Sequence, residues 1–186
     1  MKRREFLLAI TAIPLVMSMA GRAHSERPAS TGTGDSLEEI RRTWQSLLAQ
    51  GADVTLSTEA IQKSEGEWKQ ILSGPQFYVL RKEGTERPFS SPLNDEKRPG
   101  VYACVGCALP LFTSRMKFDS GTGWPSFFTH IPGHVGTKWD FSLIVPRTEY
   151  HCLRCRGHQG HVFDDGPPPT RQRWCNNGVA LRFIPV

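Results

Sequence analysis

Four of the five cysteines form two C-x-x-C pairs, and this arrangement restricts the fold more than any other feature of the sequence. Cys104 and Cys107 form the first pair, and Cys152 and Cys155 form the second. Thiolates are soft metal ligands, and two such pairs supply the four sulfurs of a tetrahedral zinc site. Four protein ligands leave no open coordination position, so we expect one structural zinc ion that holds two distant segments together. Two local disulfides, or a redox-active pair, are the alternatives.

The fifth cysteine, Cys175, stands apart from both pairs in the segment R-W-C-N-N. A lone thiol beside a proton acceptor is a candidate nucleophile. His158 and His161 are candidates for proton transfer near neutral pH, with zinc ligation or solvent exposure as the alternatives. Arg173 lies two residues before the cysteine, so on a strand it would share its face and add positive potential there.

The first residues are typical of an export signal. The adjacent Arg3 and Arg4 are followed by an apolar run from Leu7 to Ala20, which is too short for a comfortable transmembrane helix. The paired arginines resemble a twin-arginine signal. We therefore expect a signal peptide at 1–23 and export, to the periplasm of a bacterium. A general secretory signal or an uncleaved anchor is the alternative.

The net charge gives little support for a nucleic-acid partner. The formal net charge is +5, but four basic residues and one acidic residue within the expected signal peptide account for +3 of it, which leaves +2. The sequence also lacks a patterned basic stretch with interleaved aromatic residues. We therefore expect no nucleic-acid partner, and no stable membrane association after removal of the signal.

The remaining chain divides into a linker, a few helices and a β-rich portion. We expect a flexible linker at 24–35, an N-terminal helical extension at 36–63 and a catalytic domain at 64–186. The first helix is expected to continue to Gly51 and to bury Trp44 in the core, as a later helix should bury Trp68. Three serines are typical of helix N-caps, and they are Ser36, Ser64 and Ser73.

Short apolar and β-branched segments separated by Gly and Pro predict an antiparallel β domain after Gly84. The segments expected to form strands are 100–103, 141–145, 148–151 and 179–183.

Five segments together resemble the methionine sulfoxide reductase B family, which reduces the R epimer of methionine sulfoxide. They are G-T-E-R-P-F from Gly84, G-V-Y-A-C-V-G-C from Gly100, F-D-S-G-T-G-W-P-S-F from Phe118, C-L-R-C-R-G-H-Q-G-H-V-F-D-D-G-P from Cys152 and R-W-C-N-N from Arg173. The ordered combination is specific, although no single segment would be. The resemblance implies a mainly β fold of two small antiparallel sheets with short N-terminal helices, and one zinc ion held by the two cysteine pairs.

The resemblance also implies roles for individual residues. Cys175 is expected to attack the sulfoxide sulfur and to become a sulfenic acid. The substrates implied are oxidised proteins or peptides that carry methionine R-sulfoxide. Trp124 is expected to pack on the methyl group of the substrate, with a purely structural role in the core as the alternative. The implied active site has catalytic residues Cys175, His158, His161 and Asn177, and substrate-binding residues Trp124, Arg173 and Phe163.

One position departs from the pattern of many family members. Where these carry a second cysteine that resolves the sulfenic acid, this chain has Thr122. The other four cysteines are assigned to zinc, so we expect an external thiol, either a small molecule or a thioredoxin-like protein, to regenerate Cys175. Two other function classes remain open: a zinc-bearing interaction module, and a disulfide-exchange enzyme that uses one C-x-x-C pair.

Overall fold

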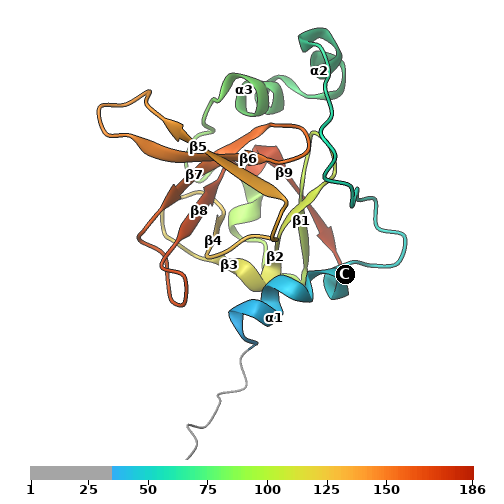
Figure 1. Cartoon of the computed structure of the whole chain (residues 1–186), viewed down its shortest axis with the longest axis vertical. Coiled ribbons are helices and arrows are strands. Elements are labelled where there is room, and N and C mark those ends of the chain that lie inside the picture. Colours follow the sequence, from blue (N-terminus) through green and yellow to red (C-terminus); the bar gives the residue numbers. More distant parts are fainter. Residues whose placement is uncertain (1–34) are drawn as a thin grey trace, which may run out of the picture. The chain divides into compact units, whose positions relative to one another are not determined.

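The computed structural model describes residues 35–186, so the expected signal peptide and nearly all of the expected linker lie outside the described residues. The described part is mainly β with short helices, as expected (Figure 1). The α-helices are α1 Leu37–Arg42, α2 Glu65–Ile71 and α3 Gly74–Lys82. Within residues 35–186, none of the helices combines the length and the apolar character that a membrane crossing requires.

Serine N-caps begin all three helices, as predicted. Ser64 forms a complete capping box with Glu67, and Ser73 forms another with Gln76, so each helix start satisfies two backbone N–H groups. Pro75 occupies the first turn of α3, where it removes no helical hydrogen bond.

The prediction that the first helix continues to Gly51 is wrong. Helix α1 ends at Arg42, and Thr43 leaves the helical conformation while its hydroxyl donates to the Glu39 carbonyl at 2.8 Å. A 3₁₀ turn at Trp44–Leu47 follows and buries Trp44 in the core. Trp68 is buried as well, so both tryptophans are core residues as predicted.

Nine strands form two antiparallel sheets among the described residues. The sheets have the orders β2-β1-β9 and β3-β4-β8-β7-β6-β5, which confirms the predicted architecture. The strands are β1 Gly100–Cys104, β2 Pro110–Thr113, β3 Lys117–Phe118, β4 Ser126–Phe127, β5 Val135–Asp140, β6 Arg147–Cys152, β7 His158–Phe163, β8 Arg173–Asn176 and β9 Leu181–Pro185.

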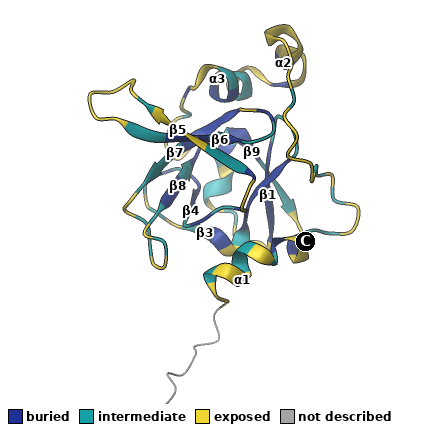
Figure 2. Cartoon of the chain, viewed as in Figure 1, coloured by how far each residue is buried: buried dark blue, intermediate teal, exposed yellow. Residues whose placement is uncertain are grey.

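Aromatic rings from both sheets form the centre of the core. Phe112 on β2 stacks on Phe127 of β4 with ring centroids 4.1 Å apart, and Tyr102 on β1 meets Phe127 edge-on at 5.0 Å. All three side chains are fully buried. Such ring pairs add to the free energy gained by burying apolar area, so they fix how the two sheets pack. Figure 2 shows the central strands as buried, whereas helix α2 is largely exposed.

The strand expected at 141–145 is wrong. These residues form the exposed connection of the β5–β6 hairpin, whose ladder ends with Asp140 opposite Arg147. The N–H and hydroxyl of Ser142 both bond the Asp140 carboxylate, at 2.9 and 2.5 Å. This local turn competes successfully with strand pairing, although the segment is rich in apolar and β-branched side chains.

Candidate active site and metal centre

Cys175 lies in the middle of the larger sheet, on β8 between β4 and β7. It pairs with Ser126 on one side and with His161 on the other. Directly opposed residues of neighbouring antiparallel strands project from the same face of a sheet. The sheet register therefore places the His161 imidazole beside the Cys175 thiol.

Gly160 allows this close approach of β7 and β8. A Cβ atom at position 160 would overlap the carbonyl oxygen of Cys175. The absence of a side chain there is thus a requirement of strand packing next to the thiol.

A cavity of about 120 Å³ opens beside the Cys175 thiol. Its small volume suits one side chain rather than a folded partner. His158 and Arg173 are buried, and neither is among the residues that line the cavity. The lining residues are Thr85, Trp124, Arg147, Gly160, His161, Phe163, Cys175, Asn176 and Asn177.

The environment of Cys175 acts on its pKa in two directions. Burial raises the pKa of the thiol above its ordinary value of 9.0. The positive charge of Arg173 and a hydrogen bond from Thr122 oppose this effect without cancelling it. The thiol is therefore neutral at pH 7, and its attack on a substrate requires a proton acceptor.

Thr122 belongs to a chain of hydroxyl groups beside the thiol. The Ser120 hydroxyl lies 2.8 Å from the Thr122 hydroxyl and 2.8 Å from that of Ser126, the strand neighbour of Cys175. Thr122 thus places a hydroxyl beside the nucleophile, at the position where many proteins of the family that the sequence resembles carry a resolving cysteine.

His161 is held by a carboxylate that the sequence did not indicate. Its Nε2 lies 2.7 Å from Oδ2 of Asp140, which also pairs with Arg147 at 2.7 Å. Burial lowers the pKa of His161, and the hydrogen bond to Asp140 partly opposes this shift. A neutral imidazole at pH 7 can accept a proton from Cys175. Asp140 was missed because the sequence pattern predicted no strand at 135–140, where β5 carries this residue.

His158 occupies a different environment from His161. Its Nδ1 lies 2.8 Å from Glu149, and its Nε2 is buried with no hydrogen-bond partner in the part of the chain described. The rings of His158 and His161 are 5.4 Å apart. Burial raises the pKa of Glu149, but hydrogen bonds from His151 and His158 outweigh this and bring it to about 2. His158 thus lies beside His161, which lines the cavity, and beside the ionised carboxylate of Glu149.

Arg173 is fixed behind the thiol. Its guanidinium makes two hydrogen bonds of 2.8 Å to Asp165 and lies 4.3 Å from the ring centroid of Phe163. The pair with Asp165 raises the pKa of Arg173, so the charge next to Cys175 is permanent. The predicted contact of Arg173 with substrate stays a prediction.

Glu86 also belongs to the site, although it had no predicted role. Its carbonyl accepts from the Trp124 indole at 3.2 Å, and its N–H donates to Asn177 Oδ1 at 2.9 Å. The Asn177 amide also donates to the Gln159 carbonyl at 2.9 Å. Glu86 therefore connects the two cavity-lining side chains Trp124 and Asn177, and its place in the G-T-E-R-P-F segment was the available signal.

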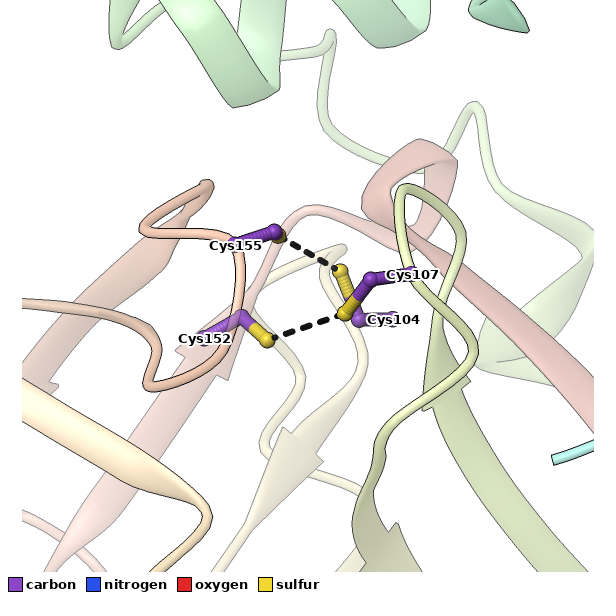
Figure 3. A group of neighbouring side chains, drawn as sticks. All are labelled: Cys104, Cys107, Cys152 and Cys155. Atoms are coloured by element: carbon purple, nitrogen blue, oxygen red, sulfur yellow. Dashed lines mark hydrogen bonds between the residues drawn. The ribbon is translucent and has the colours of Figure 1, made fainter. Parts of the chain in front are cut away.

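The four remaining cysteines converge at a separate centre, shown in Figure 3. All four Sγ atoms lie within 4.8 Å of one another, and the closest approaches join the two pairs at 3.6 Å and 3.5 Å. Four sulfurs at about 2.3 Å from a tetrahedral zinc ion would be about 3.8 Å apart. A disulfide needs an S–S distance of about 2.0 Å. The donor set and its spacing therefore fit zinc rather than disulfides.

Both cysteine pairs have the same backbone geometry. Cys104 and Cys152 are the last residues of β1 and β6. Their carbonyl oxygens accept from the N–H groups of Ala108 and Arg156, at 2.8 and 2.9 Å, and these two residues have positive φ. Each turn thus presents two thiols to one point, so the two distant segments meet at one centre as predicted.

Groups around the thiols supply further hydrogen bonds. Arg81 donates to the Cys155 Sγ at 3.4 Å and to the Cys155 carbonyl at 2.8 Å, while its guanidinium stacks on Trp68. Hydrogen bonds from the other thiols, together with the charge of Arg81, lower the pKa of Cys155. Such outer contacts orient metal ligands and favour the thiolate form.

These observations define a mainly β protein with a four-thiol centre and a separate cysteine in a small cavity. The SelR domain family matches residues 72–185. The chain therefore belongs to the SelR domain family, the methionine sulfoxide reductase B enzymes.

Curated relatives support this assignment. The chain is 50% identical over 129 residues to "Peptide methionine sulfoxide reductase MsrB" of Methanosarcina barkeri, covering 69% of this chain and 91% of that protein. It is 46% identical over 132 residues to the MsrB protein of Agrobacterium fabrum, covering 70% of this chain and 98% of that protein. It is 53% identical over 121 residues to "Peptide methionine sulfoxide reductase B1, chloroplastic" of Arabidopsis thaliana, covering 64% of this chain and 60% of that protein.

Proposed function

We propose that this protein reduces methionine R-sulfoxide in peptides or proteins through a sulfenic acid on Cys175. One observation carries the proposal: Cys175 shares a small cavity with His161 and Trp124, while the other four cysteines are gathered elsewhere. The family to which the chain belongs, and the names of its relatives, support the same chemistry.

In the proposed first step, the substrate side chain enters the cavity with its methyl group against the Trp124 indole. His161 accepts the thiol proton of Cys175, and the thiolate attacks the electrophilic sulfur of the sulfoxide. The S–O bond of the substrate breaks as the oxygen passes to Cys175 and takes the proton that His161 held. The balance is one thiol and one sulfoxide converted into one sulfenic acid and one thioether.

The other residues of the site hold these groups in place. Asp140 fixes the His161 ring through Nε2, which leaves Nδ1 for proton exchange. Arg173 and Thr122 favour the thiolate of Cys175. Asn177, whose side-chain oxygen and nitrogen both bond backbone groups, connects Gln159 of β7 to the segment that carries Glu86.

In the proposed second step, an external thiol restores Cys175. One thiol attacks the sulfenic acid and releases water, and a second thiol breaks the resulting mixed disulfide. The absence of a cysteine at position 122 supports this route. The donor is either a small thiol or a thioredoxin-like protein. We further propose that Cys104, Cys107, Cys152 and Cys155 hold one structural zinc ion, which takes no part in the reaction.

We also propose that the protein is exported to the bacterial periplasm. The paired arginines and the apolar run near the N-terminus support this, and they lie outside the described residues. Cell fractionation of the protein and of an Arg3→Lys, Arg4→Lys variant tests it. Export by the twin-arginine route predicts that the variant stays in the cytoplasm, and equal export of both proteins would contradict that route.

The proposed reaction is tested by incubating the protein with R- and S-sulfoxide peptides and either a small thiol or thioredoxin as donor. We expect turnover of the R epimer alone, and loss of this turnover in Cys175→Ser. A circular-dichroism spectrum and a thermal melt of the variant exclude unfolding as the cause. Reduction of the S epimer, or full activity of Cys175→Ser, would disprove the proposal.

A further inference from the structure

Exposed apolar side chains are concentrated in one loop of this protein. The loop consists of residues 141–146, with the sequence F-S-L-I-V-P, and is called the apolar loop below. Half of the ten large apolar side chains that are exposed within residues 35–186 lie in the seven positions 139–145. Ile144 is 102% exposed, as fully as in an unfolded chain, and the loop contains no charged residue. Soluble proteins seldom leave such a cluster uncovered without a binding role.

The apolar loop adjoins the proposed active site. It is flanked by Asp140 and Arg147, which face each other as the last pair of the β5–β6 ladder and form an ion pair of 2.7 Å. Asp140 also bonds His161, and Arg147 lines the cavity that contains Cys175. Because the loop has six residues, each lies within about three residues, or roughly 12 Å, of this pair.

The base of the apolar loop is ordered by hydrogen bonds. The N–H and the hydroxyl of Ser142 bond Asp140, at 2.9 and 2.5 Å. Phe141 and Trp139 hold their rings 6.4 Å apart at the point where the loop leaves β5. In Figure 1 the loop projects from the end of the β5–β6 hairpin, and Figure 2 shows it as exposed. The loop thus presents apolar side chains from a hydrogen-bonded base, next to Arg147 in the cavity lining.

We propose that the apolar loop binds the residues that flank the oxidised methionine in a peptide substrate. The inference rests on the proposed function and specifies its substrate class as sequences with apolar residues next to the methionine. The cavity, at about 120 Å³, holds one side chain, so the rest of a bound peptide must lie across its rim. An exposed rim that is apolar and carries no charge favours apolar side chains on that part of the peptide. Such flanking side chains gain free energy when they cover Phe141, Leu143, Ile144 and Val145.

The experiment compares an Ile144→Ser, Val145→Ser double variant with a control double variant, Leu56→Ser and Ile71→Ser. The control removes two side chains that are each 55% exposed and lie outside the β5–β6 hairpin. Three substrates are used: N-acetylmethionine R-sulfoxide, a peptide with leucine and valine beside the sulfoxide, and a peptide of equal length with serine and glutamine there. Thermal melts verify that both variants fold.

We expect the loop variant to lose about five- to tenfold in kcat/KM for the apolar peptide. Its kcat/KM for N-acetylmethionine R-sulfoxide should stay within about twofold of that of the unmodified protein, since this substrate is too short to reach the loop. The control variant should match the unmodified protein on all three substrates.

Several outcomes would overturn the proposal. Equal losses on the peptide and on N-acetylmethionine R-sulfoxide would show that the loop only supports the cavity. No loss on the apolar peptide would remove the loop from substrate binding. In that case, loss of binding to phosphatidylglycerol vesicles would assign it to a membrane surface, and loss of a dimer in sedimentation would assign it to a second copy. Failure of the unmodified protein to reduce any of the three substrates would instead disprove the proposed function.

Discussion

The side-chain amide of Gln159 donates a hydrogen bond to Sγ of Cys104, which lies 3.4 Å away. Gln159 is on β7, next to the strand that carries Cys175, and its carbonyl accepts two hydrogen bonds from Asn177, at 2.8 and 2.9 Å. One buried residue therefore joins the four-thiol centre to the wall of the cavity. Disorder at the metal centre should therefore also displace residues of the active site.

Metal removal should lower both stability and activity. We expect the protein as isolated to contain one zinc ion per chain, and a chelator to reduce the free energy of unfolding by several kcal/mol, since binding to the folded state alone stabilises it. Zinc content and the melting temperature are the measurements. Cys104→Ser should behave like the chelated protein, whereas Cys175→Ser should keep its zinc. A metal-free protein with an unchanged melting temperature would contradict this prediction.

Replacement of Arg173 should make Cys175 less reactive. Burial raises the pKa of Cys175, and the charge of Arg173 lowers it, so Arg173→Met should raise this pKa further. Since only the thiolate is alkylated, the rate of iodoacetamide labelling should rise with pH in both proteins, but at higher pH in the variant. At pH 8 we expect labelling to be slower by about three- to tenfold, given that one pKa unit changes the thiolate fraction tenfold.

Arg171→Met provides the matched control for this experiment, because Arg171 is exposed and close in sequence. Its labelling profile should coincide with that of the unmodified protein. Overlapping profiles for all three proteins would show that Arg173 does not act on the thiol.

Asp140→Asn should make His161 a weaker proton acceptor. The Asp140 carboxylate raises the pKa of His161 against the effect of burial, so its loss should lower that pKa and reduce proton transfer. We expect kcat to fall by about tenfold, and by about a hundredfold or more in His161→Gln. The acid limb of kcat/KM against pH should move to lower pH in Asp140→Asn, because the imidazole then stays neutral in more acidic solution.

Asp164→Asn, which alters an exposed carboxylate, should leave the rate and the pH profile unchanged. An unmoved acid limb in Asp140→Asn would show that Asp140 has a purely structural role.

Thr122→Cys should convert the protein to internal resolution. The Thr122 hydroxyl is within hydrogen-bonding reach of Cys175, so a thiol at this position should attack the sulfenic acid. After one equivalent of substrate, mass spectrometry should find an intramolecular disulfide in the variant and a sulfenic acid in the unmodified protein. A second replacement, Cys175→Ser, should abolish the disulfide. An internal disulfide of Cys175 in the unmodified protein would refute the requirement for an external thiol.

Much of the fold followed from local sequence signals. The Ser64 and Ser73 caps correctly predicted two helices, because capping involves residues three apart. The two cysteine pairs correctly predicted one four-thiol centre, because each pair lies in a short turn. The strand at 141–145 was predicted wrongly, because apolar β-branched residues favour strands, whereas the hydrogen bonds from Ser142 to Asp140 form a turn that this preference does not register.

The sequence alone predicted the functional groups of this protein: four thiols for a metal, one thiol for a reaction, and histidines for proton transfer. Only the tertiary structure placed Asp140 against His161 and set Thr122 beside Cys175, because these contacts depend on strand register and not on spacing along the chain. It also brought the two histidines together, since residues three apart on a regular strand face opposite sides, and the register shift near Tyr150 and His151 puts His158 and His161 on one face with ring centroids 5.4 Å apart.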